Sequence, residues 1–208
     1  AEKIFRPRTD RPERKTKFEC AGMTNHELAA TAYFADNAQK LAKIAKILGR
    51  DADAQKYEKL AENIKSAFVK KFVFEDGTVD NETQTAYLFA LAFDLLPENI
   101  REKSFGRFVD VLEKSGVYLR TGFLGTPLLT EVLTRFGRAD LAYRLLLNEQ
   151  FPSWLYTVNQ GATTMWERWN SYSRTNGFGD ASMNSFNHYA YGAIGAWIYK
   201  TVAGIWYD

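Results

Sequence analysis

The sequence predicts an all-α fold, an α/α toroid in which helical hairpins form two concentric layers. Segments that are apolar on nearly every side alternate three times with amphipathic segments. Their openings recur at roughly 45 to 55 residues, a period typical of helical arrays. Strand signals are confined to fragments near residues 73–79, 116–119 and 156–158, which are too short to form a sheet of their own.

An open solenoid of helical hairpins fits the same alternation. In a toroid, however, the loops that enter the inner helices converge on one end of the molecule. The unusual residues of this chain lie in such loops, at positions 121–123, 154–164 and 177–184. Their common position favours the toroid over the solenoid.

The first predicted helix begins at a capping box formed by Thr24 and Glu27 and ends at Gly49. Its wide apolar surface is typical of an inner helix. Asp51 is expected to cap a second helix, whose amphipathic pattern over 57–72 indicates one face in solvent.

The later helices follow from the same signals. Residues 83–96 are apolar nearly all round, so an enclosed helix is expected there, and Pro97 ends it. The remaining predicted helices cover residues 98–112, 128–136, 140–148 and 184–203.

Composition excludes several classes of partner. The formal net charge is only +2, from 27 basic and 25 acidic residues, so no field attracts nucleic acid or an anionic membrane. No apolar run reaches the ~18 to 20 residues that a membrane span needs. Cys20 is the single cysteine, and with only His26 and His188 beside it no metal-ligand set is expected. No cofactor is expected either.

Basic residues are concentrated at the start of the chain. Residues 1–17 contain seven lysines or arginines against three acids, together with Pro7 and Pro12. We therefore expect residues 1–23 to form a basic, poorly ordered arm or a truncated edge. Residues 24–208 are expected to form the helical domain.

The most unusual stretch covers residues 154–191, where tryptophans and tyrosines alternate with Asn, Gln, Ser and Thr. Flat rings cover the apolar faces of a sugar, while amides, hydroxyls and imidazole bind its hydroxyl groups. A polyhydroxylated ligand is therefore expected here. The predicted ligand-binding residues are His188, Trp166, Trp169, Trp154, Asn184 and Phe123.

Glu167 is the candidate catalytic carboxylate of this stretch. Glycosidic cleavage needs two carboxyl groups, and a wide separation between them leaves room for water. If residues 161–169 open a helix, the helix dipole and Arg168 favour the ionised form and hence the base role. A capping or ion-paired glutamate is the alternative. Asp180 lies in a Gly-rich loop and either lines the site or turns the chain.

Seven runs of the sequence occur in a distinctive order: ATAYF (30–34), QTA (84–86), TGFLGTPLL (121–129), AYRLLL (142–147), FPSW (151–154), GATTMWERW (161–169) and MNSFNHYAYG (183–192). Together these runs resemble the catalytic domain of bacterial α-L-rhamnosidases, inverting enzymes with an (α/α)6 toroid. The resemblance implies hydrolysis of terminal α-L-rhamnosyl residues of a glycoside or oligosaccharide. It also implies that Glu167 matches the general base of the family and His188 a histidine that contacts rhamnose, while Trp154, Trp166 and Trp169 line or buttress the pocket.

One departure from the family concerns the general acid. The Arg-Asp-Glu-Arg type segment that carries it, and the Gly-Asp-Trp type stretch after it, are not found here. The chain thus resembles the C-terminal part of such an enzyme. Its expected partner is the N-terminal part of the same enzyme, and the chain by itself is expected to have little activity. The resemblance implies a bacterial protein, and the sequence leaves open whether its compartment is the cytoplasm or the periplasm.

Three other functions are left open by the sequence. The chain could be a carbohydrate-binding or scaffolding remnant without chemistry, or a helical-repeat module that binds protein on its concave surface. Another toroidal glycosidase with a different sugar specificity also fits, because fold alone does not fix the substrate.

Overall fold

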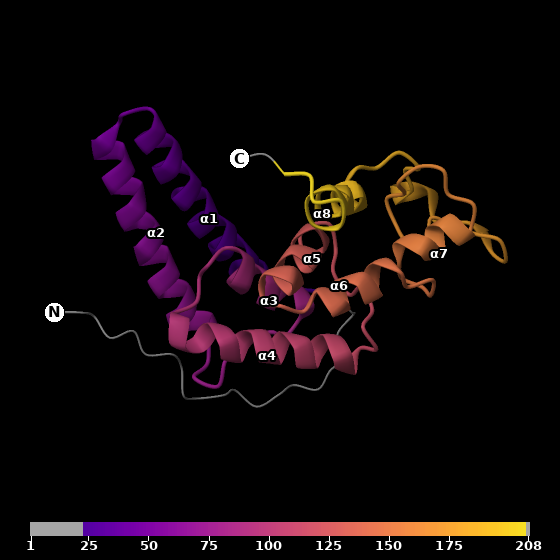
Figure 1. Cartoon of the computed structure of the whole chain (residues 1–208), viewed down its shortest axis with the longest axis horizontal. Coiled ribbons are helices and arrows are strands. Elements are labelled where there is room, and N and C mark those ends of the chain that lie inside the picture. Colours follow the sequence, from indigo (N-terminus) through magenta and orange to yellow (C-terminus); the bar gives the residue numbers. More distant parts are fainter. Residues whose placement is uncertain (1–22, 207–208) are drawn as a thin grey trace. The chain divides into compact units, whose positions relative to one another are not determined.

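The computed structural model describes residues 23–206, so the arm expected at 1–23 lies almost wholly outside the described residues. Within this range the regular secondary structure is helical apart from one two-stranded hairpin and one isolated bridge, which confirms the all-α class (Figure 1). The chain divides into two compact units, with the boundary between Val111 and Leu112. In the described range no helix is long and apolar enough to cross a membrane.

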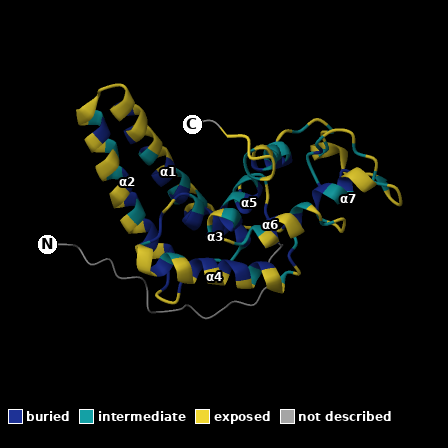
Figure 2. Cartoon of the chain, in the orientation of Figure 1, coloured by how far each residue is buried: buried dark blue, intermediate teal, exposed yellow. Residues whose placement is uncertain are grey.

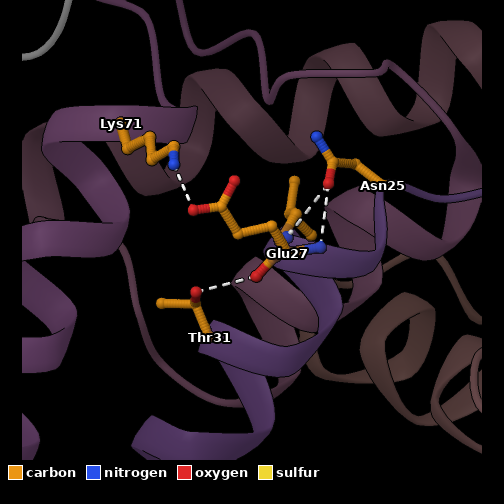
Figure 3. A network of polar contacts seen from close by, with 5 residues as sticks. Asn25, Glu27, Thr31 and Lys71 are labelled. Carbon is orange, nitrogen blue, oxygen red and sulfur yellow. Dashed lines mark hydrogen bonds and ion pairs between the residues drawn. The ribbon is translucent and has the colours of Figure 1, made fainter.

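The first unit begins with the hairpin of α1 (His26–Ile47) and α2 (Asp51–Phe72). The capping box predicted at Thr24 is wrong, because the side chain of Asn25 accepts the N–H of Glu27 at 2.9 Å. Thr24 instead makes a hydroxyl contact with Thr83 at 2.8 Å. Figure 3 shows the carboxylate of Glu27 paired with Lys71 of α2, so it ties the two helices together.

Small residues on α1 allow α2 to pack closely against it. The buried positions of α1 are mostly alanines, among them Ala32, Ala38 and Ala42. The predicted enclosure is incomplete, however, because four large apolar residues of α1 and its C-cap residue Leu48 are exposed (Figure 2). We call these residues the α1 stripe: Phe34, Leu41, Ile44, Ile47 and Leu48.

Helix α3 (Gln84–Ala92) is the enclosed helix that the sequence predicts, since every residue from Gln84 to Leu91 is buried. It ends four residues before the predicted Leu96, because Asp94 adopts a left-handed conformation with φ of 52°. Helix α4 (Glu98–Lys114) follows Pro97 and buries Ile100 and Phe108. The turn at Asp76-Gly77 is closed by the bridge between Val73 and Val79.

In the second unit α5 (Thr126–Arg135) and α6 (Ala139–Leu146) form a hairpin close to the predicted bounds. The turn between them is fixed by Gly137 at φ of 76° and by Arg138, which pairs with Asp140 at 2.9 Å. A short helix, α7 (Trp154–Asn159), follows, capped by the hydroxyl of Ser153 at 3.0 Å from the N–H of Tyr156. Residues 156–158 are therefore helical rather than β-rich.

The last predicted helix, 184–203, begins too early. A 3-10 turn (Ala190–Ala193) leads into α8 (Ile194–Trp197) and then into a π-helical turn (Ile198–Val202). Residues 184–189 are not helical, because their backbone groups bind the segment that contains Glu167. Trp197 anchors this helical region to α5, donating from Nε1 to the hydroxyl of Thr134 at 2.8 Å.

Gly77 provides a test of backbone packing in the first unit. We expect Gly77→Ala to destabilise the chain more than Gly49→Ala, although both glycines have positive φ. A Cβ at position 77 would lie 2.6 Å from the backbone carbon of Lys103, whereas one at position 49 meets nothing within 4 Å. Gly49→Ala should therefore cost only the left-handed strain, about 1 to 2 kcal/mol.

Chemical denaturation of the two variants and the parent chain measures this difference in the free energy of unfolding. Equal losses in the two variants would show that the close approach of Gly77 to α4 contributes nothing.

Candidate functional site

The candidate site is built on two paired segments of the second unit, 164–167 and 185–188. The N–H of His188 donates to the carbonyl of Met165 at 2.9 Å, and the N–H of Glu167 donates to the carbonyl of Ser185 at 2.9 Å. The hydroxyl of Thr164 donates to the carbonyl of Phe186. The pairing fixes the backbone at Glu167 and at His188 relative to each other.

Glu167 is half-buried and its carboxylate is held from one side. Oε2 accepts the N–H of Ser185 at 2.8 Å, so Glu167 and Ser185 are joined through both backbone and side chain. Among the described residues, Oε1 has no hydrogen-bond partner. Residues 161–170 do not form the predicted helix, and the guanidinium of Arg168 binds the carbonyl of Asp180 at 2.8 Å instead of Glu167. The proposed effect of a helix dipole on Glu167 is therefore wrong.

The imidazole of His188 lies between two aromatic rings. It stacks on Phe123 with 4.6 Å between ring centroids and on Tyr189 with 5.5 Å. Nδ1 of His188 accepts the N–H of Ala190 at 3.3 Å, so the neutral ring carries its proton on Nε2. Nε2–H of His188 is therefore the hydrogen-bond donor of this ring, whose faces stack on Phe123 and Tyr189.

Trp154 and Trp169 support this arrangement from below the surface. Trp169 stacks on Tyr191 with 3.9 Å between centroids, and Trp154 meets Trp169 edge-on at 5.6 Å. The indole N–H of Trp154 donates to the carbonyl of Tyr191 at 2.9 Å. Both tryptophans are buried, and burial also raises the pKa of Tyr191. A continuous series of rings therefore runs from Trp154 through Tyr191 and Phe123 to His188.

Trp166 belongs to a second aromatic cluster. Its ring meets Phe186 edge-on at 5.4 Å and Tyr172 at 6.3 Å. Tyr172 lies on the small hairpin of β1 (Tyr172–Ser173) and β2 (Gly177–Phe178), where it is paired with Phe178. Trp166 thereby ties the hairpin to the segment that contains Glu167.

A clasp of polar contacts holds the loops around the site. The amide Nδ2 of Asn184 donates to the carbonyl of Ser171 at 3.0 Å, and the N–H of Gly179 donates to the same oxygen at 2.8 Å. A Cβ at position 179 would lie 2.9 Å from the backbone carbonyl oxygen of Asn170, which favours glycine there. Two polar atoms inside the clasp, Nε of Arg168 and Oδ1 of Asn184, are buried without partners.

Asp180 turns the chain rather than presenting a second carboxylate. Its Oδ1 accepts the N–H of Ser182 at 2.9 Å and caps a short 3-10 turn (Ala181–Met183). Hydrogen bonds from Ser182 lower the pKa of this carboxyl, and the nearby Arg168 adds to the effect. Of the two functions that the sequence left open for Asp180, the structure favours the turn.

The predicted residues are thus brought into two neighbouring groups. His188, Phe123, Trp154 and Trp169 share one series of rings, and Trp166 adjoins Glu167 in sequence but packs on the second cluster. Asn184 lies in the clasp. In the described residues no group of histidine, cysteine and carboxylate side chains could hold a metal ion.

Sequence reasoning missed Tyr191 and Ser185, which connect these groups. Tyr191 contacts Phe123, Trp169 and Trp154 together, and Ser185 holds the carboxylate of Glu167 through its backbone. The aromatic alternation at 189 and 191 could have indicated Tyr191. The contact of Ser185 with Glu167 could not be predicted from residue type, because any residue except proline has the backbone N–H that makes it.

The loops of the second unit thus combine an ordered glutamate with an extended series of aromatic rings, and the class of protein that matches this chain is a glycosidase domain. A family model described as the bacterial α-L-rhamnosidase six-hairpin glycosidase domain matches residues 9–202, and the chain belongs to this family. The family also agrees with the toroid that the sequence predicts.

Relatives of known structure or activity support this membership. The chain is 51% identical to an α-L-rhamnosidase of Formosa agariphila over 88% of its length, and 47% identical to one of Alteromonas sp. over 93%. A crystal structure of Streptomyces avermitilis α-L-rhamnosidase complexed with L-rhamnose matches 89% of the chain at 46% identity, with a TM-score of 0.85. The chain spans about a fifth of these proteins: 20%, 21% and 18% of their lengths, respectively.

The buried rings should matter more for stability than the exposed one beside them. We expect Trp169→Ala to lower the free energy of unfolding by about 3 to 5 kcal/mol, because it removes a large buried ring. Tyr189→Ala should change it by no more than about 0.5 kcal/mol, since Tyr189 is 87% exposed. Urea denaturation of both variants tests this. A similar small effect for both would mean that the ring series is not part of the core.

Proposed function

We propose that the chain supplies the general base and part of the sugar-binding surface for hydrolysis of terminal α-L-rhamnosyl residues, with inversion of configuration. The observation that carries this proposal is the fixed carboxylate of Glu167 beside a histidine stacked between aromatic rings. Membership of the rhamnosidase family supports the choice of sugar.

Glu167 is suited to activate water. The Ser185 N–H bound to Oε2 fixes the orientation of the carboxylate, and Oε1 is left to accept a proton from a water molecule. In an inverting glycosidase the base lies on the face of the sugar opposite the leaving group, so one ordered oxygen that bonds water is what the reaction requires.

His188 and its neighbouring rings are suited to hold the sugar. Nε2–H can donate to a hydroxyl group, and Nδ1 is already occupied by the Ala190 N–H, so the tautomer does not have to change when the sugar binds. The Tyr189 ring, stacked parallel to the imidazole, adds an exposed apolar face against which the sugar can lie.

The leaving group needs a second carboxyl group, and the segment between residues 160 and 190 offers none that is free. Glu167 and Asp180 are the only acids between residues 160 and 190, and Asp180 is occupied by Ser182. The general acid is therefore expected to come from outside the chain. A carbohydrate-binding function without turnover is the second candidate, favoured by the same observation.

The chain alone should accordingly be nearly inactive. Loss of general acid catalysis costs on the order of 10²- to 10⁴-fold in rate. Release of rhamnose from an aryl α-L-rhamnoside by the purified chain measures this directly. Turnover at the rate of an ordinary glycosidase would contradict the proposed absence of the acid.

A chimera tests the base itself. The matching segment of the Streptomyces avermitilis enzyme would be replaced by this chain, which superposes on it with a TM-score of 0.85. We expect the chimera to hydrolyse an aryl α-L-rhamnoside, and Glu167→Gln in it to lower kcat about 10²- to 10⁴-fold. Glu102→Gln, an exposed glutamate of α4, is the matched control and should leave kcat unchanged.

The outcomes separate the two candidates. A folded chimera that binds L-rhamnose but has no activity, and whose binding is lost in Trp166→Ala and kept in Glu167→Gln, would favour the carbohydrate-binding function. Full activity in Glu167→Gln would contradict the assignment of the base.

A further inference from the structure

A second concave site lies in the same unit as Glu167. It is a hollow of about 420 Å³ between the loop that precedes α5 and the end of α6. This volume falls in the range of small-molecule binding pockets. Gly116, Val117 and Tyr118 line one side of the hollow, and Arg144, Asn148 and Glu149 line the other.

The backbone on the first side is held in an unusual conformation. Gly116 and Val117 both have positive φ, of 82° and 61°, and a β-branched residue such as valine rarely adopts such an angle. The N–H of Val117 closes the end of α4 by donating to the carbonyl of Leu112 at 3.0 Å. Strain of this kind is concentrated at binding and catalytic sites.

Glycine is required at position 116 by the ring of Tyr118. A Cβ at that position would lie 2.9 Å from Cε2 of Tyr118, so the ring packs directly over the glycine backbone. The turn and the ring are therefore placed together. An aromatic face is fixed at the edge of the hollow as a result.

The polar groups that line the hollow suit a sugar. Arg144 provides guanidinium N–H donors and Glu149 provides carboxylate acceptors, the pair of groups that bind neighbouring hydroxyls of a pyranose. Oε2 of Glu149 is oriented by the amide of Asn159 at 3.4 Å, and Oδ1 of Asn148 accepts the N–H of Gln150 at 2.9 Å. The opposite charges of Arg144 and Glu149 favour a neutral ligand over an anion.

The hollow shares its two loops with the candidate site. One loop carries both Tyr118 and Phe123, and the next carries both Glu149 and Trp154. The two members of each pair are five positions apart in the sequence. A fully extended chain of that length limits the distance between their Cα atoms to about 18 Å. A glycan of a few sugar units could therefore reach from one place to the other.

We propose that this hollow binds a neutral pyranose unit of the glycan, further along the chain from the terminal rhamnosyl residue that the Glu167 site receives. This inference rests on the proposed function for the identity of the glycan. The hollow itself is distinct from the Glu167 site, because its lining includes neither Glu167 nor His188.

A titration followed by NMR tests the site. The probe is a neutral trisaccharide of pyranose units with a terminal α-L-rhamnosyl residue, added to the full 208-residue chain. We expect amide shifts at 116–118 and 147–149 that saturate with the trisaccharide. Arg144→Ala and Glu149→Gln should each raise the Kd for the trisaccharide about tenfold, which is the effect of losing a hydrogen bond to a charged group.

Two controls isolate the effect. Lys59→Ala removes an exposed positive charge from α2 and should leave the binding unchanged. The shifts at 116–118 and 147–149 are followed separately from those at 164–167 and 185–188. Saturating shifts at 116–118 and 147–149 alone support this site even if the proposed function fails, and shifts at 164–167 and 185–188 alone overturn this site. Glu149→Gln keeps the shape of the side chain and serves if Arg144→Ala does not fold.

The inference would be overturned by either of two results. One is a trisaccharide titration that shifts no amide in the two loops. The other is unchanged saturation in Glu149→Gln with the fold intact.

Discussion

The pairing of residues 164–167 with 185–188 is the constraint on which the rest of the site depends. These segments contain no regular secondary structure, and backbone hydrogen bonds between them replace the helices that the sequence indicates at both places. Because each segment supplies backbone hydrogen-bond partners to the other, the two non-helical segments fix each other's position. Glu167 and His188 therefore owe their positions to each other's backbone as well as to their own side chains.

Large aromatic residues serve two purposes in this unit, and burial distinguishes them. Trp154 and Trp169 are almost fully enclosed, and their contacts with Tyr191 make them part of the core. The ring of Tyr189 is exposed, and His188 lies between it and Phe123. Rings that look equivalent in the sequence thus divide into a support beneath the site and a surface that can meet a ligand.

The sequence predicted helices best where local signals agree with packing. The bounds of α5 and α6 and the enclosure of α3 follow from apolar periodicity with Gly137 and Pro97 as stops. It failed at 161–170 and 184–189, because mutual pairing of two distant loops leaves no periodic pattern. Glu167 and His188 were predictable from their chemistry, whereas the Ser185 N–H and the Asn184 clasp depend on backbone geometry that residue types do not encode.

The α1 stripe has a consequence for the behaviour of the protein in solution. Ile47 is 84% exposed, Leu48 66% and Phe34 54%. Full burial of such a side chain stabilises a fold by roughly 1.5 to 3 kcal/mol relative to full exposure. The exposed part of each stripe residue does not contribute this stabilisation. Salts that strengthen the hydrophobic effect, such as sulfate, raise the free-energy cost of exposing these apolar side chains to water. The thermal midpoint of this chain should therefore depend on the salt in the buffer and on any partner that covers the α1 stripe, as well as on the packing within the chain.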